Sequence, residues 1–142
     1  MKYFHSAFFL LLATGFISCK TYSISTESLQ QQFAGIDSSK FIDVSVKGPV
    51  GETYRYKANP IKVIKCTDKN NRSFELVNSP SIEMRVTHKN KKTIFYFDRV
   101  FVSDSTIKGV QSRFISSLTK TILLKDIKKI EIQDGRKNYH YQ

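Results

Sequence analysis

From residue 41 onward, apolar and polar residues alternate along most of this chain, and a period of two is typical of half-buried β-strands. The alternating segments are short, and turn-forming pairs such as Asn59-Pro60 separate them. The candidate strands cover residues 41–47, 53–57, 61–67, 72–77, 82–88, 93–103, 106–111, 121–124, 127–132 and 139–141. The polar pair Asp98-Arg99 interrupts the longest of them, which indicates a bulge or a bend there. We expect about seven to nine strands, which predicts an all-β domain built as a small antiparallel β-barrel or sandwich.

One short segment nearer the N-terminus has the period of a helix instead. Leu29 and Phe33 lie four residues apart and would share one face of a helix over residues 26–34. Ser25 or Thr26 can cap its first turn. A helix of this length is not stable alone, so we expect it to dock on the β-domain.

The first residues have the pattern of an export signal. Lys2 precedes an uncharged apolar stretch over residues 7–17. That stretch is too short to span a hydrocarbon core as a helix, which takes roughly 20 residues. A charged start, a short apolar middle and small residues at the end indicate a signal peptide. Two cleavage sites compete, one after Gly15, which would release a soluble secreted protein, and one before Cys19.

The second cleavage site carries a family resemblance. Residues 16–19 (Phe-Ile-Ser-Cys) resemble a relaxed lipobox, and the N-terminus is similar to those of small, uncharacterised outer-membrane lipoproteins of Bacteroidetes. The resemblance implies that Cys19 becomes the first residue of the mature chain and carries a diacylglycerol and an acylated amine, with palmitate-type chains in the membrane. Because no acidic cluster follows Cys19, we expect the protein to face the periplasm from the outer membrane.

A second, shorter resemblance lies near the C-terminus. Residues 104–109 and 120–132 are similar to segments of small β-barrel domains found in uncharacterised lipoproteins of the same bacteria. This resemblance implies barrel-like packing and no activity. The chain is therefore expected to comprise a signal peptide (1–18), a lipid-anchored tether with a short helix (19–40), in which residues 20–25 form the polar tether, and the all-β domain (41–142).

The charge of the chain narrows the choice of partner. Lys and Arg number 23 against 12 Asp and Glu, which gives a net charge of +11. An exported protein does not meet nucleic acid, so the acidic partners left are anionic lipid head groups, lipopolysaccharide phosphates, acidic glycans and acidic envelope proteins. Because the lysines are spread along the whole chain, the simpler interpretation is that they keep the surface soluble.

Residues that could carry chemistry are few. If Cys19 is lipidated, Cys66 has no partner for a disulfide, and its alternating context predicts a small buried hydrophobe. His88 and His140 stand far apart in the sequence, and neither has the neighbours that metal ligation needs. Paired carboxylates for glycosidic chemistry would have to come from Glu75, Glu83, Asp98 and Asp104.

These observations favour a protein without catalytic residues, metal or cofactor. The chain lacks a Gly-x-Ser-x-Gly elbow and a phosphate-binding glycine loop. Aromatic residues at 54–56 and 95–97 are better explained by core packing than by stacking on sugars. We therefore expect a non-enzymatic binding or structural module of the cell envelope, attached to the membrane through Cys19. The alternatives are an immunity-type or inhibitor lipoprotein against a toxin or hydrolase and, less favoured, a small hydrolase.

Overall fold

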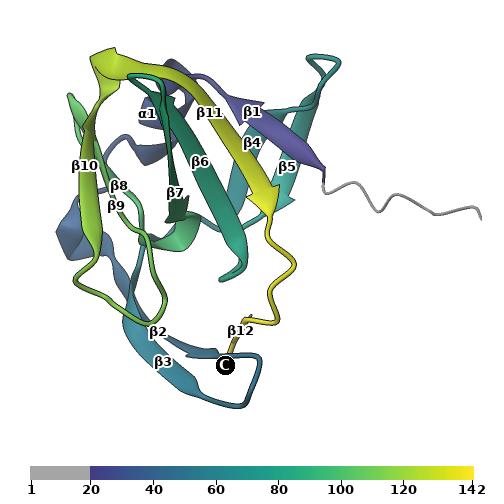
Figure 1. Cartoon of the computed structure of the whole chain (residues 1–142), viewed down its shortest axis with the longest axis vertical. Coiled ribbons are helices and arrows are strands. Elements are labelled where there is room, and N and C mark those ends of the chain that lie inside the picture. The colour runs from purple at the N-terminus through teal and green to yellow at the C-terminus, as the bar shows by residue number, and fades with distance from the viewer. Residues whose placement is uncertain (1–19) are drawn as a thin grey trace, which may run out of the picture.

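The computed structural model describes residues 20–142, and Figure 1 shows how their strands and helices are arranged. Twelve strands occur in this part of the chain, together with one α-helix and three 3-10 helices. The strands are β1 (Thr21–Ile24), β2 (Ile42–Lys47), β3 (Thr53–Ala58), β4 (Val63–Thr67), β5 (Ser73–Val77), β6 (Ile82–His88), β7 (Lys91–Tyr96), β8 (Phe101–Val102), β9 (Thr106–Val110), β10 (Thr119–Leu123), β11 (Ile127–Asp134) and β12 (His140–Tyr141). The helices are α1 (Thr26–Phe33), η1 (Ser38–Lys40), η2 (Phe97–Arg99) and η3 (Leu124–Asp126).

The strands form three antiparallel sheets, which confirms the predicted all-β class. The largest sheet has the order β5-β4-β1-β11-β6-β7, and the two smaller ones have the orders β10-β9-β8 and β12-β2-β3. Each sheet ends in two different strands, so over residues 20–142 the sheets do not close into a barrel. The expected number of seven to nine strands is wrong. Strand β1 lies outside the candidate ranges, and the candidate over residues 93–103 divides into the two strands β7 and β8.

Strand β1 lies in the segment that the sequence predicted to be a polar tether. Its residues pair with β11 from Thr21↔Gln133 to Ile24↔Ile130, and on its other side it meets β4. Tyr22 and Ile24 are buried, whereas the residues between and before them are exposed. Residues 21–24 therefore form a central strand of the large sheet. The predicted signal peptide (1–18) and the predicted lipidation site Cys19 lie outside the described residues.

Helix α1 forms where the helical period predicted it. The Ser25 hydroxyl accepts a hydrogen bond from the Ser28 backbone N–H at 3.1 Å, and Leu29 and Phe33 are buried against the sheets. The side-chain amide of Gln32 pairs with the backbone of Lys65 in β4, donating to its carbonyl at 2.9 Å and accepting from its N–H at 2.8 Å. The helix thus docks on the domain as expected. Within residues 20–142, no helix is long and apolar enough to span a bilayer.

The hydrophobic core joins the large sheet to the sheet β10-β9-β8. The two sheets lie close together at Gly109 in β9, where an added Cβ would lie 2.5 Å from Cδ1 of Phe95 in β7. Only a residue without a side chain lets the two strands come this close. The core residues that share this cluster include Ile64, Met84, Val86, Phe97, Val100, Ile107, Ile122, Ile130 and Ile132.

The long strand candidate over residues 93–103 is bent, as the polar pair Asp98-Arg99 predicted. The chain leaves β7 after Tyr96, makes one turn of 3-10 helix and enters β8 at Phe101. Phe97 and Asp98 in this turn are both fully buried. The bend therefore places the charged side chain of Asp98 in the interior of the protein.

The position of β1 gives the first prediction. Replacing Ile24 with alanine is expected to lower the free energy of unfolding by about 2–4 kcal/mol, because it leaves a cavity in a central strand. Replacing the exposed Ser23 in the same strand with alanine is expected to change it by less than about 0.5 kcal/mol. Urea denaturation measures both. Equal, small effects would mean that residues 21–24 are a tether.

Candidate functional site

A buried ion pair lies where the three sheets meet. The carboxylate of Asp98 in η2 accepts a hydrogen bond from the guanidinium of Arg113 at 3.0 Å, and both side chains are fully buried. Two phenol groups of the third sheet donate to the same carboxylate, Tyr56 from β3 at 2.5 Å and Tyr141 from β12 at 2.9 Å. We call these four residues the Asp98 hub.

Aromatic rings enclose the cation of this hub. The guanidinium carbon of Arg113 lies 4.0 Å from the ring centre of Tyr96 and 5.5 Å from that of Tyr139. Its nitrogens also donate to the Pro80 carbonyl and to the Tyr56 hydroxyl. Tyrosine faces attract a cation most strongly where water is excluded, so the rings offset part of the cost of burying Arg113.

The phenols of the hub remain protonated over the ordinary pH range. Burial, followed by the nearby negative charge of Asp98, raises the pKa of Tyr56 and of Tyr141 far above the usual range. Each phenol can therefore donate its proton to Asp98 at neutral pH. Both oxygens of Asp98 accept hydrogen bonds from donors in different parts of the fold, so the hub holds the sheets together.

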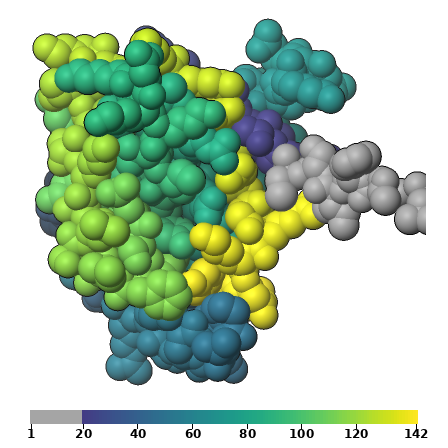
Figure 2. Space-filling view, in the orientation of Figure 1, coloured from purple at the N-terminus to yellow at the C-terminus, as the bar shows by residue number. Residues whose placement is uncertain are grey.

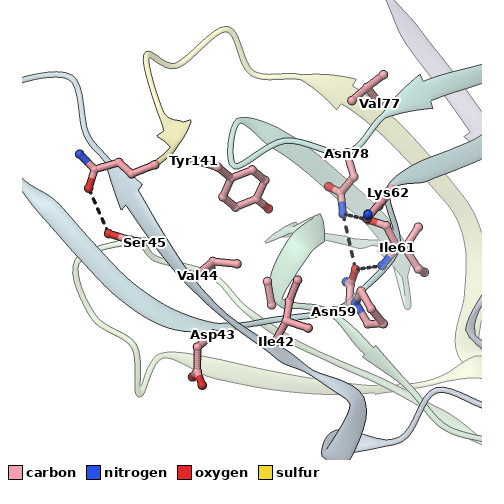
Figure 3. Close-up of a pocket in the computed structure, with 13 residues that line it drawn as sticks. Ile42, Asp43, Val44, Ser45, Asn59, Ile61, Lys62, Val77, Asn78 and Tyr141 are labelled. Atoms are coloured by element: carbon pink, nitrogen blue, oxygen red, sulfur yellow. Dashed lines mark hydrogen bonds between the residues drawn. The ribbon is translucent and has the colours of Figure 1, made fainter.

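A groove opens beside the hub, along the edge of β2. It has a volume of about 410 Å³ and runs between β2, the segment that links β3 to β4, and the end of β5 (Figure 3). The side chains of Ile42 and Val44 point into it, as does the ring of Tyr141, whose hydroxyl reaches the hub. Val77 at the rim has 72% of its surface exposed. The groove is therefore mostly apolar and open to solvent.

Two asparagines form the polar wall of the groove. Asn59 donates from its side-chain amide to the carbonyls of Phe97 and Val100 at 2.7 and 3.2 Å, which fixes the orientation of the amide. Asn78 donates from its own amide to the Ile61 carbonyl at 2.8 Å. The remaining oxygen, Oδ1 of Asn78, is buried and has no hydrogen-bond partner among residues 20–142.

Lysines gather at one end of the large sheet, around the turn between β6 and β7. His88 is at this end, and burial, followed by the charges of Lys120, Lys91 and Lys89, lowers its pKa. One carboxylate, Asp126, bonds to Lys89 at 3.3 Å. We call this surface the cationic end, and its lysines are Lys89, Lys91, Lys92, Lys120, Lys125 and Lys128.

The cationic end lies opposite the start of β1. Strand β11 begins at Ile127, which pairs with His88 at the cationic end. It ends at Asp134, one residue after Gln133, which pairs with Thr21 at the start of β1. Eight residues of strand separate the two ends by about 25 Å. Figure 2 shows the β6–β7 turn projecting at the upper left and the purple start of the described chain on the right.

The other chemistry candidates of the sequence do not converge. Cys66 is buried, donates weakly to the Phe74 carbonyl at 3.5 Å, and burial raises the pKa of its thiol to about 11. Strands β1 and β11 separate it from His88 in β6, so these two side chains do not form a pair. His140 lies on the surface in β12.

The carboxylates proposed for glycosidic chemistry are also dispersed. Glu83 bonds to Lys137 at 2.8 Å, and Asp98 is in the hub. Glu75 is in the exposed strand β5 and lies opposite Lys65 of β4. Asp104 is exposed in the β8–β9 turn. The described residues contain no group of three His, Cys, Asp or Glu side chains placed to hold a metal ion.

Sequence reasoning missed Arg113 and Tyr141, the partners that complete the hub. Arg113 comes from the Ser-rich loop after β9, and Tyr141 from a two-residue strand. No spacing in the sequence links them to Asp98. The one available signal was a charged pair, Asp98-Arg99, interrupting an apolar strand.

Comparisons with known proteins give no relative for this chain: no family model, curated protein or solved structure matches it.

The hub gives a prediction for stability. Replacing Arg113 with methionine is expected to lower the free energy of unfolding by about 3–5 kcal/mol, because Asp98 is left buried without its cation. The double substitution Asp98→Asn with Arg113→Met is expected to recover part of that loss. As a control, replacing Lys57, which forms an exposed ion pair with Asp43 at 3.2 Å, is expected to cost less than about 1 kcal/mol. Comparable losses at both pairs, measured by urea denaturation, would contradict a structural role for the hub.

The hub also gives a prediction for alkaline pH. The pKa values of Tyr56 and Tyr141 are higher in the folded chain than the value of about 10 expected when unfolded. Above about pH 10 the unfolded chain therefore loses these protons while the folded chain keeps them, and stability falls as the pH rises. Tyrosinate absorbance of the native protein is expected to show two phenols that ionise only on unfolding. Ionisation of all the tyrosines in the native state would contradict this.

Proposed function

We propose that this chain is an exported, lipid-anchored binding module of the bacterial cell envelope, held in the outer membrane through Cys19 and facing the periplasm. The observation that carries the proposal is the pattern of residues 2–19, in which Lys2 precedes an uncharged apolar stretch that ends just before Cys19. This order of a charged start, a short apolar middle and a small residue before the cleavage site is typical of a signal peptide.

The anchor would also restrain how the domain sits on the membrane. Thr21, two residues after Cys19, is already hydrogen-bonded into the centre of the large sheet. Two residues of extended chain reach at most about 7 Å. The end of the sheet that holds Gln133 and Asp134 would then lie against the lipid head groups, and the cationic end would face away from that membrane.

A non-enzymatic role fits the chemistry of the described residues. The buried carboxylate of Asp98 is paired with the guanidinium of Arg113, and both side chains are fully buried. Among the described residues, only Nε of this guanidinium lacks a hydrogen-bond partner. The groove beside β2 is lined mainly by apolar side chains and amides, with Asp43 and Lys62 as its charged residues. Such a surface suits binding.

A second candidate function is protection against an incoming toxin or hydrolase. The observation that favours it is the cationic end, which is exposed and would project from the membrane toward an acidic target. Charge complementarity of this kind raises association rates and makes them depend on salt. A toxin gene beside the gene for this chain would favour this candidate over a general binding module.

We also infer that the three sheets are arranged as a sandwich-like fold. The support is the shared core between the large sheet and β10-β9-β8, with Phe95 packed directly on Gly109. Two sheets that bury their apolar faces against each other in this way are the usual alternative to a barrel.

The anchor is tested by the intact mass of the protein extracted from membranes of a host that processes lipoproteins. The expected mass is that of a chain beginning at Cys19 with three added acyl chains. The Cys19→Ala variant, as a matched control, is expected to lack the acyl mass and to leave the membrane fraction after processing at another site. An unmodified wild-type chain beginning at Phe16 would replace the lipoprotein with a soluble secreted protein.

A further inference from the structure

We propose that two neighbouring loops of this domain insert into a lipid bilayer and form a second membrane contact. The loops are residues 111–118, between β9 and β10, and residues 48–52, between β2 and β3. We call their exposed apolar residues the apolar tip; they are Val50, Phe114, Ile115 and Leu118. The inference rests on the proposed function for bringing the chain to a membrane, but the contact itself does not involve Cys19.

The side chains of the apolar tip are largely exposed. Val50 has 88% of its surface exposed, Phe114 has 75%, Ile115 has 55% and Leu118 has 46%. They come from two loops that follow different strands, and three of them lie within five residues of one loop. Large apolar side chains that gather on a surface in this way mark a contact with a membrane or with another protein.

The backbone of the longer loop holds its apolar side chains outward. The hydroxyl of Ser112 accepts hydrogen bonds from the N–H groups of Phe114 and Ile115, both at 3.1 Å. The bond from Gln111 N–H to the Leu118 carbonyl, at 2.9 Å, closes the base of the loop. Because these bonds already order the backbone, little conformational entropy is lost when the loop binds.

The two loops lie beside each other. The ring of Phe114 packs edge-on against the ring of Tyr54 in β3, with 6.0 Å between the ring centres. Tyr54 follows closely after the turn that carries Val50. Figures 1 and 2 show both loops toward the lower end of the molecule, with the β2–β3 turn lowest. The apolar tip is therefore one surface built from two sheets.

The longer loop is rooted at the end of the large sheet where β1 begins. Arg113 in this loop donates to the Pro80 carbonyl, and the neighbouring Ser81 carbonyl accepts from the Gly135 N–H at 3.0 Å, directly after β11. β11 ends beside the start of β1. An anchor at Cys19 would hold this end of the sheet toward the membrane. The cationic end lies at the other end of β11.

The tip has no free charge that insertion would bury. Residues 111–118 contain one charged residue, Arg113, whose side chain is buried in the hub. Residues 48–52 contain only Glu52, whose carboxylate already accepts from the Val50 N–H at 2.9 Å. The other polar groups of the longer loop are an amide and hydroxyls, which suit the hydrated head-group region.

Cations stand behind the uncharged tip. Lys47 and Arg55 are exposed on the two strands that flank the β2–β3 turn. Along this hairpin the apolar residue at the apex is thus followed by positive charge. A bilayer has the matching order, with acyl chains beneath a layer of anionic head groups, so the cations would stay among the phosphates while the tip inserts. This order favours a lipid surface as the occupant.

The depth of the tip is measured by fluorescence. The chain contains no tryptophan, so a single introduced one reports one position. Phe114→Trp places the probe in the tip, and Leu123→Trp places it at the far end of β10 as the control. The mature protein is reconstituted with vesicles of phosphatidylethanolamine and phosphatidylglycerol that carry bromine on their acyl chains. We expect a shift to shorter wavelength and quenching at position 114, and neither at position 123.

A matched pair of leucines tests binding without the anchor. Leu118 lies just before β10 and Leu123 at its end, and they are 46% and 41% exposed. The Cys19→Ala protein, which carries no lipid, is sedimented with the same vesicles without bromine. Leu118→Ser is expected to weaken binding by about fivefold and Leu123→Ser by less than about twofold, because only the first removes inserted apolar surface. Vesicles of phosphatidylcholine alone are expected to bind at least about fivefold more weakly.

Four results would overturn the proposal. They are equal quenching, or none, at positions 114 and 123; equal loss of binding from Leu118→Ser and Leu123→Ser; equal binding to both kinds of vesicle; and a wavelength shift at position 114 that needs no vesicles and rises with protein concentration. The last result would mean that a second copy covers the tip. Should Phe114→Trp not fold, Ile115→Trp reports the same loop.

The intact mass of the chain tests the anchor separately. An unmodified chain that is still quenched at position 114 would remove the anchor and keep the apolar tip as a membrane contact. A lipidated chain without quenching at position 114 would remove the membrane contact of the tip and keep the anchor.

Discussion

The buried pair of Asp98 and Arg113 is the interaction on which the arrangement of the three sheets depends. A charge in the interior is tolerated only when other groups bond to it, and here those groups come from different sheets. η2 follows the large sheet and supplies Asp98, the loop after β9 supplies Arg113, and the third sheet supplies Tyr56 and Tyr141. Because Arg113, Tyr56 and Tyr141 all bond to the same carboxylate, they hold the sheet β12-β2-β3 to the rest of the domain. This sheet shares a smaller hydrophobic interface with the domain than the main core provides between the other two sheets.

The bond between Tyr141 and Asp98 also shapes the groove beside β2. The hydroxyl of Tyr141 in the short strand β12 bonds to Asp98. β12 itself pairs with the C-terminal residues Val46 and Lys47 of β2. The groove lies next to these residues, with Ile42 and Val44 in its lining. The groove and the hub thus share the side chain of Tyr141. A ligand that displaced the Tyr141 ring would also disturb the hub, which would couple binding to the stability of the third sheet.

Much of the fold was predictable because its signals are local. The period of two located β2 to β7 and β9 to β11 to within a few residues, and the cap and apolar spacing located α1. The interruption at Asp98-Arg99 located the bend before β8. Strand β1 was not predictable, since Tyr22 and Ile24 are only two apolar positions in a polar run and become a strand only because β4 and β11 lie on either side.

Of the candidate site, the sequence by itself determined the residue types and little of their arrangement. It identified a basic chain, a small inward-facing Cys66 and the charged residue Asp98 in an apolar strand, since each depends on composition or on neighbours along the chain. Only the tertiary structure decided that Asp98 meets Arg113 and Tyr141, and that a groove opens beside β2. The contacts of Asp98 with Arg113 and Tyr141 join residues 15 and 43 positions apart in the sequence, and no local period records such separations.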